Sequence, residues 1–199
     1  MAKYAVICAS NQNRSMEAHH VLNFRTNIKT SKKGFNVKSY GTGSMVRLPG
    51  PSIDKPNIYP FGTPYEKVYQ ELKSQDQQLY TQNGLLSMLD RNRKTKEAPQ
   101  RWHESRELFD VIITCEERCF DSVVEDLSNR GQNLNESTHV INVEIKDNHE
   151  DALLGGRAIL QLAQMIESSN DIDADMDGII EEFTLRNPGF PILHTVAYF

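Results

Sequence analysis

Short apolar runs alternate along the chain with segments whose apolar residues recur at helical spacing. Runs rich in β-forming residues predict strands at residues 3–8, 36–40, 111–115 and 138–143. Strands that alternate with helices indicate βαβ units and an α/β fold. We therefore expect a three-layer open sheet of about four or five mostly parallel strands with helices on both faces. The apolar residues that predict the helices are Met16, Ala18, Val21 and Leu22; Tyr65, Val68, Tyr69 and Leu72; Phe120, Val123, Val124 and Leu127; Ile159, Leu162, Ala163 and Ile166; and Ile179, Ile180 and Phe183.

One region, residues 41–64, breaks this rhythm because it holds five of the eight prolines. A connection of this length in a compact domain is usually either functional or disordered. Its apolar residues, among them Leu48, Ile58 and Phe61, favour an ordered loop that packs on the domain. We expect a single domain over residues 1–199 with this Pro-rich loop inserted in it.

Composition narrows the class of protein without identifying it. A chain of 199 residues with 38% hydrophobic and 25% charged residues is typical of one soluble globular domain. The net charge of −5 disfavours direct nucleic-acid binding, and the basic residues at 91–101 are more often a solvated surface than a partner site. We find no secretory signal and no run long enough for a membrane span. Three cysteines in such a chain suggest reduced thiols inside the cell.

Candidate chemistry lies where the first predicted strand ends, in the segment C-A-S-N-Q-N-R-S from Cys8 to Ser15. Ligands of open α/β sheets lie beyond the carboxyl ends of the strands. A strand–loop–helix turn directs loop amides and the helix N-terminus at one anion, which suits a phosphate ester. Arg14 follows Cys8 at a spacing that returns its guanidinium to the same phosphate as a fork. Ser15 can donate to the Cys8 sulfur and so favour the thiolate, the nucleophile that this chemistry requires.

The five residues between the cysteine and the arginine would form the ring of phosphate-binding amides. Asn11 and Asn13 suit such a loop because asparagine tolerates left-handed backbone angles. A buried cysteine beside an ordinary polar turn is the alternative. The preceding strand, the following helix and the serine after the arginine favour the phosphate-binding loop. Its members are Ala9, Ser10, Asn11, Gln12 and Asn13.

The loop resembles that of the low-molecular-weight tyrosine phosphatases, C-x-G-N-x-x-R-S, with Ser10 where glycine is usual. A closer resemblance covers nearly the whole chain and is to the eukaryotic phosphatases of the RNA polymerase II C-terminal domain, which work with the cleavage and polyadenylation machinery. The extra residues around 23–31, relative to animal members, have no assigned role. The matching segments are C-A-S-N-Q-N-R-S-M-E-A-H, G-T-G, R-L-P-G, D-K-P-N, Y-T-Q-N-G-L-L, M-L-D-R-N, T-C-E-E-R and V-I-N-V-E-I-K-D-N.

This resemblance implies a fold like that of the low-molecular-weight phosphatases and a phosphoserine substrate. The substrate would be the polymerase repeat Y-S-P-T-S-P-S, chiefly its fifth-position serine, with the following proline bound as the cis isomer, which is a minority of about 10–30% in flexible peptides. It also implies a role in transcription termination and mRNA 3′-end processing, a nuclear location and a symplekin-like scaffold as partner. Leu48, Pro49 and Gly50, with Met88 opposite, would form the peptide groove; the alternative is that they only anchor the loop.

Expulsion of a serine alkoxide needs a proton donor, and the resemblance assigns this role to Asp147. It follows the fourth predicted strand and so can face Cys8 from a strand's carboxyl end. It would protonate the leaving oxygen and then, as carboxylate, activate the water that hydrolyses phosphocysteine. Asn148 follows it where tyrosine-specific relatives have proline. The alternatives are an N-cap role for Asp147 in the next helix and Glu144 as the acid.

Other signals are weaker. The acidic segment 173–178 mimics the start of a calcium loop, but Thr184 stands where such loops have a bidentate glutamate, so a linker or helix entrance is favoured. Cys115 and Cys119 read as structural thiols, and His149 lacks partners at metal spacing. We expect no metal and no cofactor. The rival functions are a tyrosine phosphatase or arsenate reductase of the same fold, or a non-enzymatic scaffold that binds phosphorylated Pro-rich peptides.

Overall fold

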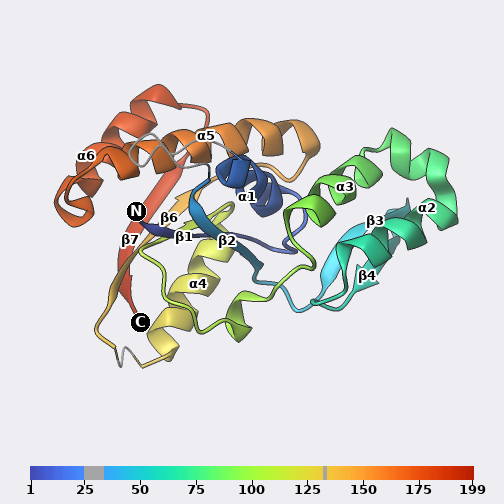
Figure 1. The fold of residues 1–199 in the computed structure, drawn as a ribbon, viewed down its shortest axis with the longest axis horizontal. Coiled ribbons are helices and arrows are strands. Elements are labelled where there is room, and N and C mark those ends of the chain that lie inside the picture. The colour runs from blue at the N-terminus through green and yellow to red at the C-terminus, as the bar shows by residue number, and fades with distance from the viewer. Residues whose placement is uncertain (25–33, 132–133) are drawn as a thin grey trace.

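The computed structural model describes residues 1–24, 34–131 and 134–199, and its centre is a five-stranded sheet (Figure 1). The strand order is β2-β1-β5-β6-β7, in which the first four strands run parallel and β7 is antiparallel to β6. The predicted α/β class and the mostly parallel sheet are therefore confirmed, while the fifth strand was not located from the sequence. The bounds are β1 Lys3–Cys8, β2 Asn36–Gly41, β5 Val111–Thr114, β6 Ser137–Val143 and β7 Ile192–Tyr198.

Helices cover both faces of this sheet, as expected. On one face α1, Arg14–Phe24, packs against α5, His149–Ser168, with α6, Ile172–Arg186, beside them (Figure 1). On the other face lie α4, Glu117–Asn129, and the short 3-10 turn η1, Trp102–Glu104. Each face has its own apolar core, because β-strand side chains alternate between the two sides of the sheet.

The Pro-rich segment is not a loop, which corrects the sequence prediction. Within it β3, Val46–Ser52, and β4, Lys55–Tyr59, form an antiparallel hairpin. Proline lacks a backbone donor and is tolerated in strands that have an open edge, and both strands of an isolated hairpin have one. The hairpin packs with α2, Tyr65–Gln82, and α3, Leu85–Thr95, which project to one side of the main sheet (Figure 1).

The hairpin, α2 and α3 share a third apolar cluster that attaches them to the main body. Met16 of α1 is fully buried in this cluster together with Tyr65 of α2 and Leu89 of α3. Since Met16 follows the candidate loop directly, this cluster fixes the projecting part beside the carboxyl ends of the parallel strands. The hydrophobic pattern does not indicate helix α3, although the helix contains the segment M-L-D-R-N of the family resemblance.

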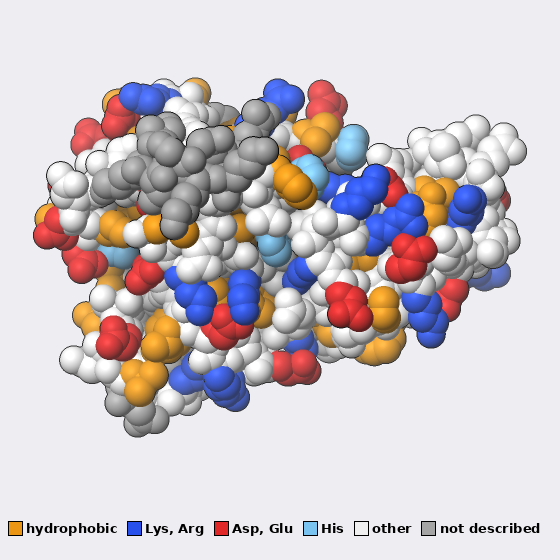
Figure 2. Space-filling model, viewed as in Figure 1, with side chains coloured by type: hydrophobic (Ala, Val, Ile, Leu, Met, Phe, Trp, Pro, Cys, Tyr) orange, Lys and Arg blue, Asp and Glu red, His pale blue; other side chains and the backbone are white. Residues whose placement is uncertain are grey.

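The fold shows the structure of two further segments, the acidic residues 173–178 and the basic residues of 91–101. Asp171 caps α6 by accepting a hydrogen bond from the Ala174 amide, so the segment 173–178 is helical and the helix-entrance reading is correct. Of the basic residues of 91–101, Arg93 and Lys94 both pair with Asp90 of the same helix. Figure 2 shows basic and acidic side chains interspersed on the visible face of the molecule. The extra residues around 23–31 lie almost wholly outside the described residues.

Within the described ranges, none of the helices is both long and apolar enough to cross a membrane. The same residues contain no group of three or more His, Cys, Asp or Glu side chains arranged to hold a metal ion.

Candidate active site

The candidate loop runs from the end of β1 to the start of α1 and is held by the end of β2. The Thr42 amide donates to the Cys8 carbonyl at 3.0 Å, and the Gly43 amide donates to the Ala9 carbonyl at 2.9 Å. A Cβ on Gly41 would lie 2.7 Å from the Ala9 carbonyl oxygen, so only glycine permits this approach. The G-T-G segment therefore has a structural role: it lets the end of β2 approach the backbone of the loop closely.

Cys8 and Ser15 meet as expected from their spacing. Sγ of Cys8 lies 3.0 Å from Oγ of Ser15, and both residues are buried. Asn11 Nδ2 donates to the same Ser15 oxygen at 3.0 Å, which leaves the hydroxyl proton of Ser15 available to the sulfur. A hydroxyl that donates to sulfur favours its anionic form.

Asn11 fixes the turn of the loop. Its backbone φ of 53° is left-handed, a conformation that asparagine adopts more readily than most residues. Its backbone oxygen accepts from the Tyr65 hydroxyl at 2.5 Å, and its side-chain oxygen accepts from the Gln100 amide at 3.1 Å. Contacts from two distant segments thus stabilise this unusual conformation.

Arg14 is 4% exposed, and its guanidinium contacts Ile145, Glu116 and Asp147. Nη1 donates to the Ile145 carbonyl at 2.9 Å, and Nη2 pairs with Glu116 Oε1 at 3.0 Å. Burial lowers the pKa of Arg14, but attraction to Cys8, Asp147, Cys115 and Glu116 outweighs it and raises that pKa above its ordinary value. A permanent positive charge therefore lies beside the Cys8 sulfur.

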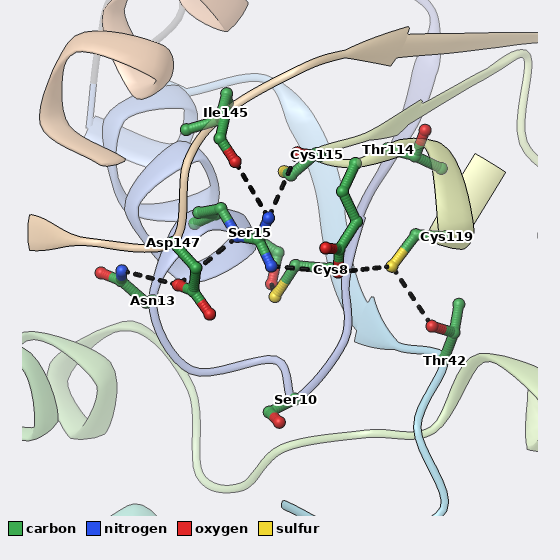
Figure 3. Close-up of polar contacts among 12 residues, drawn as sticks. Cys8, Ser10, Asn13, Ser15, Thr42, Thr114, Cys115, Cys119, Ile145 and Asp147 are labelled. Atoms are coloured by element: carbon green, nitrogen blue, oxygen red, sulfur yellow. Dashed lines mark hydrogen bonds and ion pairs between the residues drawn. The ribbon is translucent and has the colours of Figure 1, made fainter. Parts of the chain in front are cut away.

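Asp147 lies in the connection between β6 and α5 and faces the loop (Figure 3). Its Oδ1 accepts a hydrogen bond from Asn13 Nδ2 at 3.0 Å. The N-cap of α5 is Asn148, whose side chain accepts from the Asp151 amide, so the alternative N-cap role for Asp147 is wrong. Glu144 Oε2 instead accepts hydrogen bonds from the Glu117 amide and from Asn142 Nδ2. These bonds hold the Glu144 carboxylate at the start of α4.

A cavity of about 310 Å³ opens over the loop. Residues from the loop, the hairpin, α3 and the β6–α5 connection line it, so it is shaped by parts that are far apart in the sequence. Leu48, Pro49 and Met88 are among the lining residues, as expected, whereas Gly50 is not. A Cβ on Gly50 would lie 1.7 Å from the Lys55 carbonyl oxygen, so this glycine serves the close approach of the two hairpin strands.

Several residues at the site escaped the sequence reasoning. Tyr65, Arg91 and Asn92 bind backbone carbonyls of the loop, and Glu116 pairs with Arg14. Arg91 and Asn92 belong to the segment M-L-D-R-N, and Glu116 belongs to T-C-E-E-R. Nothing in the local pattern indicated that they would reach this loop, since only the tertiary arrangement brings them together.

The thiols of Cys115 and Cys119 are both buried. Burial raises the pKa of Cys115 and, likewise, that of Cys119. Cys119 Sγ contacts Thr42 Oγ1 at 3.2 Å and Glu116 Oε1 at 3.3 Å, which agrees with a structural role (Figure 3).

A mostly parallel α/β sheet with a Cys–Arg–Ser loop between its first strand and first helix defines the class of low-molecular-weight phosphatase-like folds. Residues 2–199 match the family model described as Ssu72-like protein, and the chain belongs to that family.

Two relatives can be aligned with this chain over nearly its full length. The RNA polymerase II C-terminal domain phosphatase ssu72 of Schizosaccharomyces pombe is 53% identical over 196 residues, which cover 98% of this chain and 95% of the relative. The Homo sapiens phosphatase of the same name is 49% identical over 197 residues, which cover 99% and 97%. A solved structure of Drosophila melanogaster Ssu72 with Symplekin holds a cis peptidomimetic of the C-terminal domain that is phosphorylated on the fifth-position serine. It has a TM-score of 0.90 and 47% identity, covering 100% of this chain and 98% of that one.

Proposed function

We propose that this protein is a protein serine phosphatase of the RNA polymerase II C-terminal repeat, acting through a phosphocysteine intermediate on Cys8. Its active site would bind and dephosphorylate phosphoserine that is followed by proline, chiefly the fifth-position serine of the repeat with the next proline in the cis form. The observation that carries the proposal is the contact of the Cys8 sulfur with Ser15 inside a loop closed by a buried, charged Arg14. The names of the full-length relatives, all C-terminal-domain phosphatases, support the same substrate.

The proposed reaction has two steps. The Cys8 thiolate attacks phosphorus while Arg14 and the loop amides bind the phosphoryl oxygens, and the serine oxygen leaves with a proton from Asp147. The Asp147 carboxylate then takes a proton from water as that water attacks phosphocysteine, which releases inorganic phosphate and restores the thiolate. The hydrogen bond from Asn13 and the ion pair with Arg14 keep the Asp147 carboxyl at the mouth of the loop.

The groove for the peptide would lie between the hairpin and α3. Leu48 and Pro49 line one side of the cavity and Met88 lines it from α3. An apolar wall of this kind suits the proline that follows the phosphoserine. We take residues 1–199 as one phosphatase domain, with the segment 41–64 supplying this wall as a hairpin.

The expected partner and location follow from the substrate. A protein that acts on the polymerase repeat would work in the nucleus, in transcription termination and mRNA 3′-end processing. The Drosophila structure holds Symplekin together with Ssu72, which supports a symplekin-like scaffold as partner here.

The decisive test is phosphate release from a repeat peptide phosphorylated on the fifth-position serine. Cys8→Ser should abolish turnover while leaving peptide binding, followed by fluorescence anisotropy, largely intact. Cys119→Ser is the matched control, because a serine keeps the contacts to Thr42 and Glu116, and it should turn over normally. Unchanged turnover in Cys8→Ser would discard the mechanism. Binding without turnover by the wild-type protein would favour the scaffold alternative.

A further inference from the structure

The outer side of the loop is held by Arg91 of α3. Its Nη2 donates to the Gln12 carbonyl at 2.9 Å and lies 3.3 Å from the Asn13 carbonyl. Its Nη1 pairs with Glu17 Oε2 at 2.6 Å, and the exposed fractions of the two side chains are only 12% and 9%. One guanidinium thus joins α3 to both the loop and the first turn of α1.

The neighbouring Asn92 completes this arrangement. Its Nδ2 donates to the same Gln12 carbonyl at 2.9 Å, and its Oδ1 accepts from Nη2 of Arg91 at 2.8 Å. Asn92 is fully buried. A buried carbonyl with two donors, one of them charged, is held firmly in one orientation.

The orientation of this carbonyl decides where the next amide points. In a planar trans peptide the carbonyl oxygen and the following N–H point in opposite directions. Because the Gln12 oxygen turns toward α3, the Asn13 N–H turns away from α3, toward the inner side of the loop. The contact at the Asn13 carbonyl has the same consequence for the Arg14 N–H. Both amides are among those that the loop offers to an anion.

The same helix also reaches the cavity. Leu85 and Met88, in the first turns of α3, line the cavity over the loop, one to two turns before Arg91. In Figure 1, α3 lies beside α1, and the two helices are in contact. One rigid helix therefore carries both a wall of the groove and the support of the loop.

We propose that Arg91 and Asn92 are positioning residues that keep the loop amides of Asn13 and Arg14 aimed at the phosphate, so that α3 links the peptide groove to the phosphate cradle. This inference rests on the proposed function. Neither side chain touches the substrate; both act through the backbone of the loop.

The informative variant is Arg91→Lys. It keeps a positive charge for Glu17, but a single ammonium cannot bridge Glu17, Gln12 and Asn92 as the planar guanidinium does. We expect the inhibition constant of inorganic phosphate to rise by about tenfold, the equivalent of one charged hydrogen bond. We also expect kcat/KM to fall by the same factor with an aryl phosphate and with the phosphoserine peptide, because both require the phosphate cradle. An effect through Asp147 would instead depend on the leaving group.

The matched control is Glu17→Gln. It weakens the ion pair but leaves the bonds from Arg91 and Asn92 to the Gln12 carbonyl, so the phosphate inhibition constant should stay near that of the wild type. Thermal unfolding of each variant reports on stability separately. If Arg91→Lys does not fold, Asn92→Ala is judged by the same criteria, since it removes one donor to Gln12 and keeps the ion pair.

The outcomes separate this inference from the proposed function. A folded Arg91→Lys protein with wild-type phosphate inhibition and kcat/KM would overturn the positioning role, as would an equal loss in Glu17→Gln. A wild-type protein without Cys8-dependent turnover would overturn the proposed function itself, whereas its phosphate affinity, measured by calorimetry, would still test the role of Arg91.

Discussion

Asp147 Oδ1 lies 3.5 Å from Nε of Arg14, so the proposed acid and the proposed phosphate clamp form an ion pair. The same guanidinium donates to the carbonyl of Ile145, two residues before the aspartate. The β6–α5 connection is thereby fastened to the loop by its backbone as well as by its carboxylate. Since β1, β5 and β6 are neighbours in the sheet, their carboxyl ends supply all of these groups at one edge.

Asp147→Asn should lower kcat for a phosphoserine peptide by roughly a hundred- to ten-thousandfold, the usual contribution of a general acid. An aryl phosphate needs little protonation of its leaving oxygen and should lose less than about tenfold. Steady-state kinetics with the two substrates measures the difference. Glu144→Gln serves as the control and should retain turnover, because Glu144 is engaged at the start of α4. Equal losses on both substrates would contradict the acid role.

Met88→Ala should weaken binding of the repeat peptide more than binding of a small phosphate ester, because Met88 lines the cavity and, in the proposed groove, would contact only the peptide. We expect KM for the peptide to rise by about tenfold, in line with the loss of part of a buried side chain, with KM for an aryl phosphate nearly unchanged. Phosphate release from peptides with the proline locked cis or trans tests the groove further. Turnover of the trans-locked peptide alone would refute the proposed cis preference.

His19 should make the fold sensitive to acid. Burial, with Lys96 and His20 nearby, lowers the pKa of His19 from 6.5 to about 3, so it stays neutral in the folded protein. The unfolded chain binds a proton at this residue below pH of about 6.5, and folding stability therefore falls as the pH drops through that value toward the folded pKa. At a pH of about 5 the loss from this one group is about 2 kcal/mol.

Urea unfolding at neutral and mildly acidic pH checks this dependence. His19→Gln removes the titrating group and can still hydrogen-bond to Ser39, whose Oγ lies 2.8 Å from Nδ1 of His19. The variant should lose less stability than the wild type between the two pH values. An identical loss in both proteins would show that other groups dominate.

Chelation should leave turnover unchanged and vanadate should inhibit it. The proposed reaction uses the Cys8 thiolate as nucleophile and Arg14 with loop amides for the phosphate, so no step calls for a metal ion. Turnover in excess EDTA and a vanadate titration measure both effects. Loss of activity with EDTA, restored by a divalent cation, would refute the metal-independent mechanism.

Most of the central fold could be read from local patterns, and the failures have clear causes. The parallel strands are buried on both faces and so appear as continuous apolar runs, which are easy to detect. Strand β7, I-L-H-T-V-A-Y, lies at the sheet edge and is partly exposed, which weakens its pattern. The hairpin β3–β4 was hidden by its prolines, because proline argues against a strand unless an open edge is known.

For the candidate site too, some contacts could be predicted from the sequence and others could not. Cys8, Arg14 and Ser15 lie within one short segment, and their spacing predicted the contact between Cys8 and Ser15 that the structure shows. The charge of Arg14 is also close enough to Cys8 to interact with it. Asp147 was placed by resemblance and by its position after a strand, and its contact with Asn13 stayed unforeseen. Arg91 belongs to a basic stretch and to the segment M-L-D-R-N, but neither pattern indicated its role, since its partners lie on another helix and on the loop.

By itself the sequence determined the alternation of strands and helices and the contact between Cys8 and Ser15, because both depend on residues a few positions apart. Tertiary structure alone decided that α3 supports the loop, that the hairpin forms a wall of the cavity and that Asp147 pairs with Arg14. Those contacts join segments far apart in the chain, and they form only when burial of the three apolar clusters brings the segments together.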